Sequence, residues 1–195
     1  MKQTLHLTLG ILAMSVALSF QGCDKLKSAI KTPDVNFTGA SADITIPPTN
    51  DTTAQAAIGT TTFAYNLDSM IKAQTSGVVG FNSISTIKIT SMTFTLLDGT
   101  STNNFANFAY AGGEFNTGAV DSHGNGYGPY TIAYVANNPD SYNLTFSPPI
   151  IDASQDLKKY FSSNTTFVYL VVAKLRRPIT TTLHCHVDIT YDIAF

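Results

Sequence analysis

Charge of either sign is scarce in this sequence. Only 12% of the 195 residues are charged, and 11 Lys and Arg against 13 Asp and Glu leave a formal net charge of −2. A protein that neutralises a nucleic-acid backbone needs clustered basic side chains, and the sequence offers no such cluster. We therefore expect no nucleic-acid partner, and no acidic tail is present to recruit a basic one.

Glutamate is almost missing, since Glu114 is the only one in the chain. The Ala-, Glu- and Lys-rich stretches that favour helices are correspondingly few, whereas Thr, Ser, Asn and Gly are common. Such a composition suits strands and turns, so we expect an all-β protein. A chain of 195 residues is long enough for one domain with a hydrophobic core.

Recognisable catalytic motifs are absent as well. The sequence contains neither a G-x-S-x-G nucleophile elbow nor an H-E-x-x-H zinc motif. A glycosidase would need a pair of carboxylates, and the sequence singles out no pair among its 13 acidic residues. We therefore expect a protein that is not an enzyme and holds no cofactor, with a glycan-directed hydrolase as the alternative.

What the sequence does contain, first, is an apolar segment at its N-terminus. Lys2 supplies a positive charge, and the run from Leu7 to Phe20 is interrupted only by Gly, Ser and Thr. Signal peptides have this organisation. The run is shorter than the ~20 apolar residues of a membrane-spanning helix. We therefore predict a cleaved signal peptide over residues 1–22, rather than a membrane anchor or a buried helix.

The segment Leu18–Gly22 directly precedes Cys23, one of only 2 cysteines. Its Leu, Ser and Gly resemble the lipobox of bacterial lipoproteins, in which a small residue precedes a cysteine that is diacylated and becomes the new N-terminus. Phe20 and Gln21 replace the usual Leu and small residue, a variation found in lipoproteins of Bacteroidetes-type bacteria.

This resemblance implies lipidation of Cys23. Acyl chains contribute about 0.8 kcal/mol per buried methylene, so a multiply acylated cysteine holds a soluble domain on a membrane. The resemblance also implies a tether over residues 23–33, a domain over residues 34–195, and a location in the cell envelope at the outer membrane, with the leaflet left open. A disulfide between Cys23 and Cys185 is the competing explanation for an exported protein.

Strand-like segments recur from about residue 34, separated by Gly, Pro, Asn and Asp turns. They cover residues 43–46, 61–67, 77–81, 84–99, 105–115, 130–135, 142–146, 167–175 and 182–195. Short helical turns are expected only at residues 67–74 and at residues 153–161, where Ser154 would be the cap. The spacing predicts an antiparallel two-sheet sandwich, immunoglobulin-like in arrangement, with a jelly roll as the alternative.

In the segment 84–99, the apolar side chains switch from odd-numbered to even-numbered positions. Ile87 and Ile89 alternate on one parity, and Met92 and Phe94 continue on the other. A bulge near Thr90–Ser91 would restore a single buried face.

The chain from Asp156 onward is similar to the C-terminal strands of small uncharacterised β-sandwich lipoproteins. This resemblance implies a β-sandwich fold and no activity.

The last strand contains His184, Cys185 and His186, followed by Asp188. Because side chains alternate along a strand, Cys185 falls on the apolar face and is expected in the core, whereas both histidines share the polar face. His184 and His186 are therefore candidate ligands for a divalent metal. The plainer interpretation is a polar sheet face in contact with water.

A glycine-rich stretch over residues 111–130 is the second candidate site. Its Asp121-x-His123-x-Asn125 spacing echoes the first half of a calcium loop, without the glutamate that ends such a loop. Tyr127 and Tyr130 would offer flat faces to a sugar or a peptide. Long loops on rigid sandwiches often bind ligands, and a flexible hairpin loop is the plainer alternative.

Together these features predict a lipid-anchored, non-enzymatic binding or structural module of the cell envelope. Its ligand is not specified by the sequence. Besides the membrane that Cys23 would contact, a glycan or an envelope protein is the expected partner. The alternatives are the hydrolase named above and an accessory subunit of an envelope complex.

Overall fold

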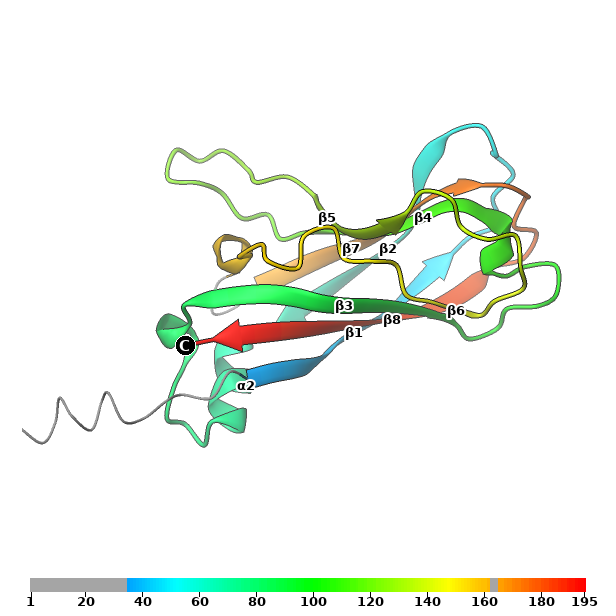
Figure 1. The fold of residues 1–195 in the computed structure, drawn as a ribbon. Helices are drawn as coiled ribbons and strands as arrows, with labels where there is room; N and C mark the ends of the chain where they lie inside the picture. Colours follow the sequence, from blue (N-terminus) through cyan, green and yellow to red (C-terminus); the bar gives the residue numbers. More distant parts are fainter. Residues whose placement is uncertain (1–34, 162–164) are drawn as a thin grey trace, which may run out of the picture. The chain divides into compact units, whose positions relative to one another are not determined.

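Antiparallel strands dominate the computed structural model, which describes residues 35–161 and 165–195. Within these residues, eight strands form one continuous sheet in the order β5-β4-β7-β2-β1-β8-β3-β6 (Figure 1). The strands are β1 (Val35–Ile46), β2 (Gln55–Tyr65), β3 (Thr86–Leu96), β4 (Phe108–Asn116), β5 (Tyr130–Val135), β6 (Thr145–Phe146), β7 (Thr165–Leu175) and β8 (Leu183–Ala194). The expectation of an all-β antiparallel protein is confirmed.

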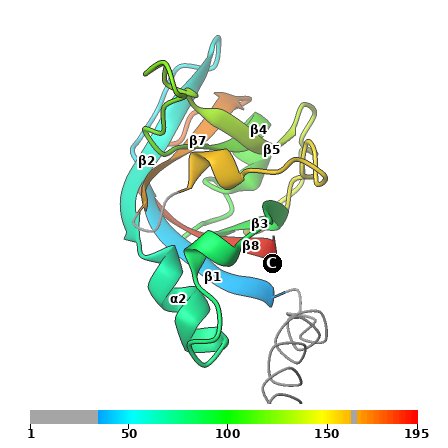
Figure 2. The same cartoon turned by 90° about the vertical axis from the view of Figure 1, so that its left-hand side faces the viewer.

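The sheet curls so that its two halves face each other (Figure 2). Gly113 of β4 packs against β3, since a Cβ atom at this glycine would lie 2.4 Å from Cε of Met92 and 2.9 Å from Cζ of Phe94. The halves are joined where β1 meets β2, through the pair Thr45 and Thr60. A single curled sheet therefore encloses the core, and an immunoglobulin-like arrangement of two sheets is not confirmed.

β8 lies at the centre of one half of the sheet, and its side chains alternate strictly between the core and the outer face. Its inward side chains are almost completely buried, and its outward ones are exposed or half-buried. The inward set is Leu183, Cys185, Val187, Ile189, Tyr191 and Ile193. β1 and β3 pair with the two edges of this strand.

The phase change in β3 is a bulge, as predicted. The register with β8 shifts between Ile89 and Ser91. Ile87 and Ile89 are buried before the bulge, and Met92 and Phe94 are buried after it. One extra residue thus returns the apolar side chains to the core face.

The short elements include one α-helix, α2 (Leu67–Gln74), with the predicted bounds and with Asn66 as its N-cap. Three 3-10 helices accompany it within the described residues, η1 (Phe81–Ser83), η2 (Phe105–Asn107) and η3 (Lys158–Tyr160). No helix in this part of the chain has the length and apolarity needed to cross a membrane. The compact unit that contains all these elements runs from Asp34 to Phe195.

Several predicted strand bounds differ from the structure: β1 begins at Val35 and β2 at Gln55, residues 105–107 form η2, and only Thr145–Phe146 of residues 142–146 is a strand. Two further segments are predicted with the wrong structure. Residues 77–81 form no strand, because Gly77 adopts a φ of 78° after α2 and the amide of Phe81 donates to Asp68 at the start of η1. Residues 153–161 contain only η3, and Ser154 does not cap it, because its amide and hydroxyl both donate to Asp152.

One segment, residues 143–158, connects the two edges of the curled sheet (Figure 1). It begins with β6, which pairs with β3. Ile150 then forms a bridge to Ala133 of β5, and the amide of Leu157 donates to the carbonyl of Ile87 on β3 at 2.7 Å. This segment therefore partly covers the free edges of β3 and β5, which protects edges that would otherwise pair with other chains.

Candidate functional site

The loop between β4 and β5 is organised by Asp121. Its Oδ1 accepts hydrogen bonds from the amides of His123 and Asn125 at 2.8 and 2.9 Å, and its Oδ2 accepts one from the side chain of Asn125 at 3.0 Å. These bonds hold the pKa of Asp121 below its usual value, and the bond from the Asn125 side chain contributes most to this lowering. The Asp121-x-His123-x-Asn125 spacing that resembles a calcium loop thus forms a hydrogen-bonded turn. Gly124 lies within this turn and has a φ of 82°.

At the base of this loop, three tyrosines and a lysine form what we call the tyrosine cluster, Tyr127, Tyr130, Tyr160 and Lys159. The ring of Tyr160 lies 5.3 Å from that of Tyr127 and 5.5 Å from that of Tyr130. The Nζ atom of Lys159 lies 5.1 Å from the Tyr127 ring centre and 5.2 Å from that of Tyr160. The structure thus brings the two predicted tyrosines together, through a third residue that the sequence did not indicate.

The inner side of the tyrosine cluster is fixed to the core. Phe115, which is 1% exposed, contacts Tyr130 with ring centres 5.6 Å apart and Tyr160, edge to face, with ring centres 5.4 Å apart. Tyr127 and Tyr130 are half-buried, so each keeps part of its ring at the surface. Burial raises the pKa of the Tyr130 and Tyr160 hydroxyls.

His184 and His186 bind separate carboxylates. The Nδ1 atom of His184 lies 2.6 Å from Asp98, which follows β3, and Nδ1 of His186 lies 2.6 Å from Asp43 of β1. Because β8 lies between β3 and β1, the two imidazoles turn toward opposite neighbours. No group of three or more His, Cys, Asp or Glu side chains in the described part of the chain is placed to hold a metal ion.

His186 contacts carboxylates at both of its nitrogens, because Nε2 lies 3.3 Å from Asp188. In a catalytic triad the imidazole instead links one carboxylate to a hydroxyl or thiol. The nearest thiol in sequence, Cys185, is a free cysteine with no exposed surface, and burial raises its pKa to about 12. Cys185 is thus a core residue, as expected, while Cys23 lies outside the described residues.

The Asp43 contact yields a prediction about pH. The hydrogen bond with Asp43, followed by the charge of Asp188, raises the pKa of His186. A raised folded-state pKa gives stability that is present below the unfolded value of about 6.5 and is lost as pH rises through the folded value. Since the pair is partly exposed, we expect wild type to lose about 0.2–1 kcal/mol of unfolding free energy between pH 6 and pH 9 from this source.

Urea denaturation of wild type and the His186→Thr variant at both pH values measures this loss. The variant should lack it, whereas His123→Thr, a change in the exposed loop, should retain it.

Replacing His184 and His186 together by Thr should alter the free energy of unfolding by no more than about 1 kcal/mol. A double variant that fails to fold, or a pH dependence identical in His186→Thr and wild type, would contradict this account.

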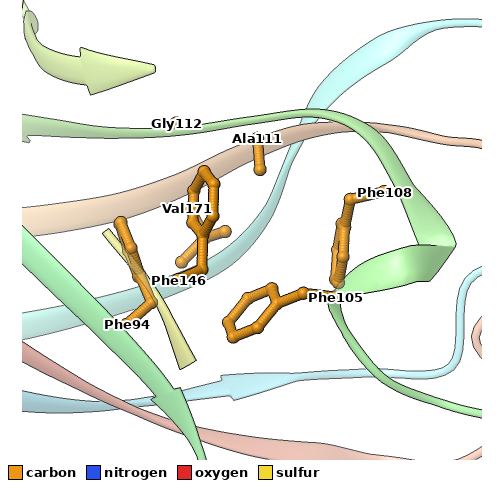
Figure 3. A pocket seen from close by; sticks show the side chains of 7 residues that line it. All are labelled: Phe94, Phe105, Phe108, Ala111, Gly112, Phe146 and Val171. Carbon is orange, nitrogen blue, oxygen red and sulfur yellow. The ribbon is translucent and has the colours of Figure 1, made fainter. Parts of the chain in front are cut away.

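An apolar gap inside the curled sheet lies beside β4 (Figure 3). Its lining is entirely apolar and consists of Phe94, Phe105, Phe108, Ala111, Gly112, Phe146 and Val171. The phenylalanine rings contact one another, with centres 5.5 Å apart for Phe105 and Phe146. The remaining space is about 10 Å³, the room of one water molecule, so it is a small packing gap of the core.

Comparisons with known proteins add little to this description. No protein-family model matches the sequence, and no curated protein matches it. Among solved structures, the chain is similar to one named Desmodium yellow mottle tymovirus, with 14% identity, a TM-score of 0.26, and coverage of 85% of this chain and 90% of that chain. A similarity at this score supports no inference about function.

Proposed function

We propose that this protein is a lipid-anchored, non-enzymatic binding module of the cell envelope, and that it binds its ligand at the tyrosine cluster. The observation that carries the binding proposal is the convergence of Tyr127 and Tyr130 on Tyr160, with Lys159 over two of the rings. Half-buried tyrosines combine a rigid apolar surface with a polar hydroxyl, which suits them to recognition surfaces.

The cluster is well placed for binding because its backing is rigid. The loop supplies Tyr127, β5 supplies Tyr130, and η3 supplies Tyr160 and Lys159. Loops that are held by a rigid sheet commonly carry binding residues. We interpret the two facing halves of the curled sheet as a sandwich, a fold class in which such loops gather at the ends of the strands.

The anchor is a proposal from the sequence alone. Cys23 follows the apolar run and the lipobox-like segment, all of which lie outside the described residues. A multiply acylated cysteine would retain the domain at the outer membrane, next to the envelope glycans and proteins that we propose as partners.

The test of binding uses the full chain, purified in a detergent without a sugar headgroup, and co-sedimentation with detergent-washed peptidoglycan sacculi of the source bacterium, which offer no bilayer to the acyl anchor. We expect wild type to sediment with the sacculi. Tyr127→Ala and Tyr130→Ala should each weaken binding about tenfold, equivalent to about 1.4 kcal/mol. Tyr142→Ala, which truncates an exposed tyrosine outside the cluster, is the matched control.

Equal binding by wild type and the two cluster variants would contradict the proposed site. Release of reducing sugar from the sacculi would contradict the non-enzymatic function and support the hydrolase alternative. Retention that depends only on a co-purified envelope protein, and not on either tyrosine, would instead favour an accessory subunit.

A further inference from the structure

A second aromatic pair lies on the outer face of the sheet. Tyr110 of β4 and Tyr134 of β5 have ring centres 5.5 Å apart with planes inclined by 23°. Ala111 and Phe115 of β4 point into the core, so Tyr110 lies on the opposite face. Tyr134 is 41% exposed, and its strand is at one edge of the sheet (Figure 1).

Gly112 determines how closely this pair lies on the sheet. A Cβ atom at Gly112 would be 2.9 Å from Cβ of Tyr134 and 3.4 Å from the hydroxyl oxygen of Tyr110. Since Gly112 is two residues beyond Tyr110, this contact means that the Tyr110 ring lies along its own strand. The glycine therefore allows one ring to lie flat on the backbone with the other stacked beside it.

Polar groups surround the pair. Glu114, two residues beyond Gly112 on the same face, accepts a hydrogen bond at Oε1 from the hydroxyl of Thr131 at 3.0 Å. Its Oε2 accepts none from the described residues. The side chain of Gln55 on β2 lies near the Tyr110 hydroxyl. The carboxylate is also close enough to raise the pKa of Tyr110, after the larger effect of burial.

We propose that Tyr110, Tyr134 and Glu114 form a binding site for a neutral pyranose sugar. A pyranose ring has a face of C–H groups that packs on an aromatic ring, and its hydroxyl edge needs strong acceptors. The free oxygen of Glu114 is such an acceptor, because hydrogen bonds to a carboxylate are about twice as strong as neutral ones. The same negative charge disfavours acidic sugars. This site does not depend on the tyrosine cluster or on the function proposed for it.

Affinity electrophoresis tests this site, with the full chain in a detergent without a sugar headgroup and gels that contain β-glucan, mannan, xylan or galactan. At least one neutral polysaccharide should retard wild type. Tyr134→Ala and Glu114→Gln should each raise the dissociation constant about tenfold, whereas Tyr142→Ala should not change it. Tyr134→Phe, which keeps the stacked ring, should retain most of the binding.

The variants also separate this site from the tyrosine cluster. If Tyr134→Ala migrates as wild type does, or if none of the four polysaccharides retards wild type, the outer site is wrong. Loss of retardation in Tyr127→Ala alone would support the tyrosine cluster and overturn the outer site. Thermal unfolding checks that Tyr134→Ala and Glu114→Gln remain folded. If these variants bind less polysaccharide only because part of each sample is unfolded, the proposal is also overturned.

Discussion

Replacing Asn107 by alanine is expected to lower the free energy of unfolding by about 3 kcal/mol. Asn107 is 1% exposed, and its Nδ2 donates to the carbonyls of Thr102 and Pro178 at 3.0 and 2.9 Å. Its Oδ1 accepts from the amide of Asn104 at 3.2 Å. Alanine would leave three backbone groups of two loops without these partners, at about 1–3 kcal/mol for each group that stays buried.

Our estimate lies in the lower part of the summed range, because Thr102 and Pro178 are themselves exposed and water can replace part of the lost bonding. Urea denaturation followed by far-UV circular dichroism measures the change. Asn143→Ala is the control, since this exposed asparagine makes a local bond to the amide of Thr145 and should matter by less than about 1 kcal/mol. Equal losses in the two variants would show that burial of the Asn107 bonds is unimportant.

The sequence predicts asparagine as a turn residue and therefore misses this role. Asn103, Asn104, Asn107 and Asn138 are all buried. The side chains of the first three bond to loop residues, and that of Asn138 bonds to the carbonyls of Phe105 in η2 and Phe108 in β4. The partners of Asn107 and Asn138 include Pro178 and Phe105, which are far away along the chain. A turn preference is local, whereas these contacts depend on how the loops meet in the folded sheet.

The strands could be predicted because their signal is local. Alternation alone identifies β8 and its buried face, and the phase change identifies the bulge in β3. The sheet order could not be predicted, because it depends on which distant strands pair. A short apolar run such as residues 77–81 also resembles a strand, although Gly77 and the bond from Phe81 to Asp68 produce a turn and a 3-10 helix there.

In the candidate sites, as in the fold, only the features with a local sequence signal could be predicted. Tyr127 and Tyr130 are recognisable in a glycine-rich loop, but Tyr160 reaches them from η3, about 30 residues further along the chain. The polar face that holds His184 and His186 follows from alternation. The imidazole rings of the two histidines point in opposite directions because one contacts Asp98 and the other Asp43. The positions of these carboxylates relative to β8 are set by strand pairing.

Substituting Cys23 by alanine is expected to transfer the protein from the membrane fraction to the soluble fraction, or to leave an unprocessed precursor. We propose that cleavage occurs between Gly22 and Cys23 and that the cysteine carries a diacylglyceryl thioether. One acyl chain gives only marginal membrane binding, whereas two or three give stable attachment. Without the thiol no chain is attached, so the change in location should be nearly complete.

Fractionation with detergent partitioning measures the location, and mass spectrometry of the N-terminal peptide identifies the modification. Cys185→Ala is the matched control, because that cysteine is buried in β8, and this variant should stay in the membrane fraction if it folds. The domain of Cys23→Ala should unfold at the wild-type urea concentration, since the eight strands of the sheet begin only at Val35. An unmodified Cys23 in wild type, or a disulfide between Cys23 and Cys185, would contradict the anchor and make the protein a plainly secreted domain.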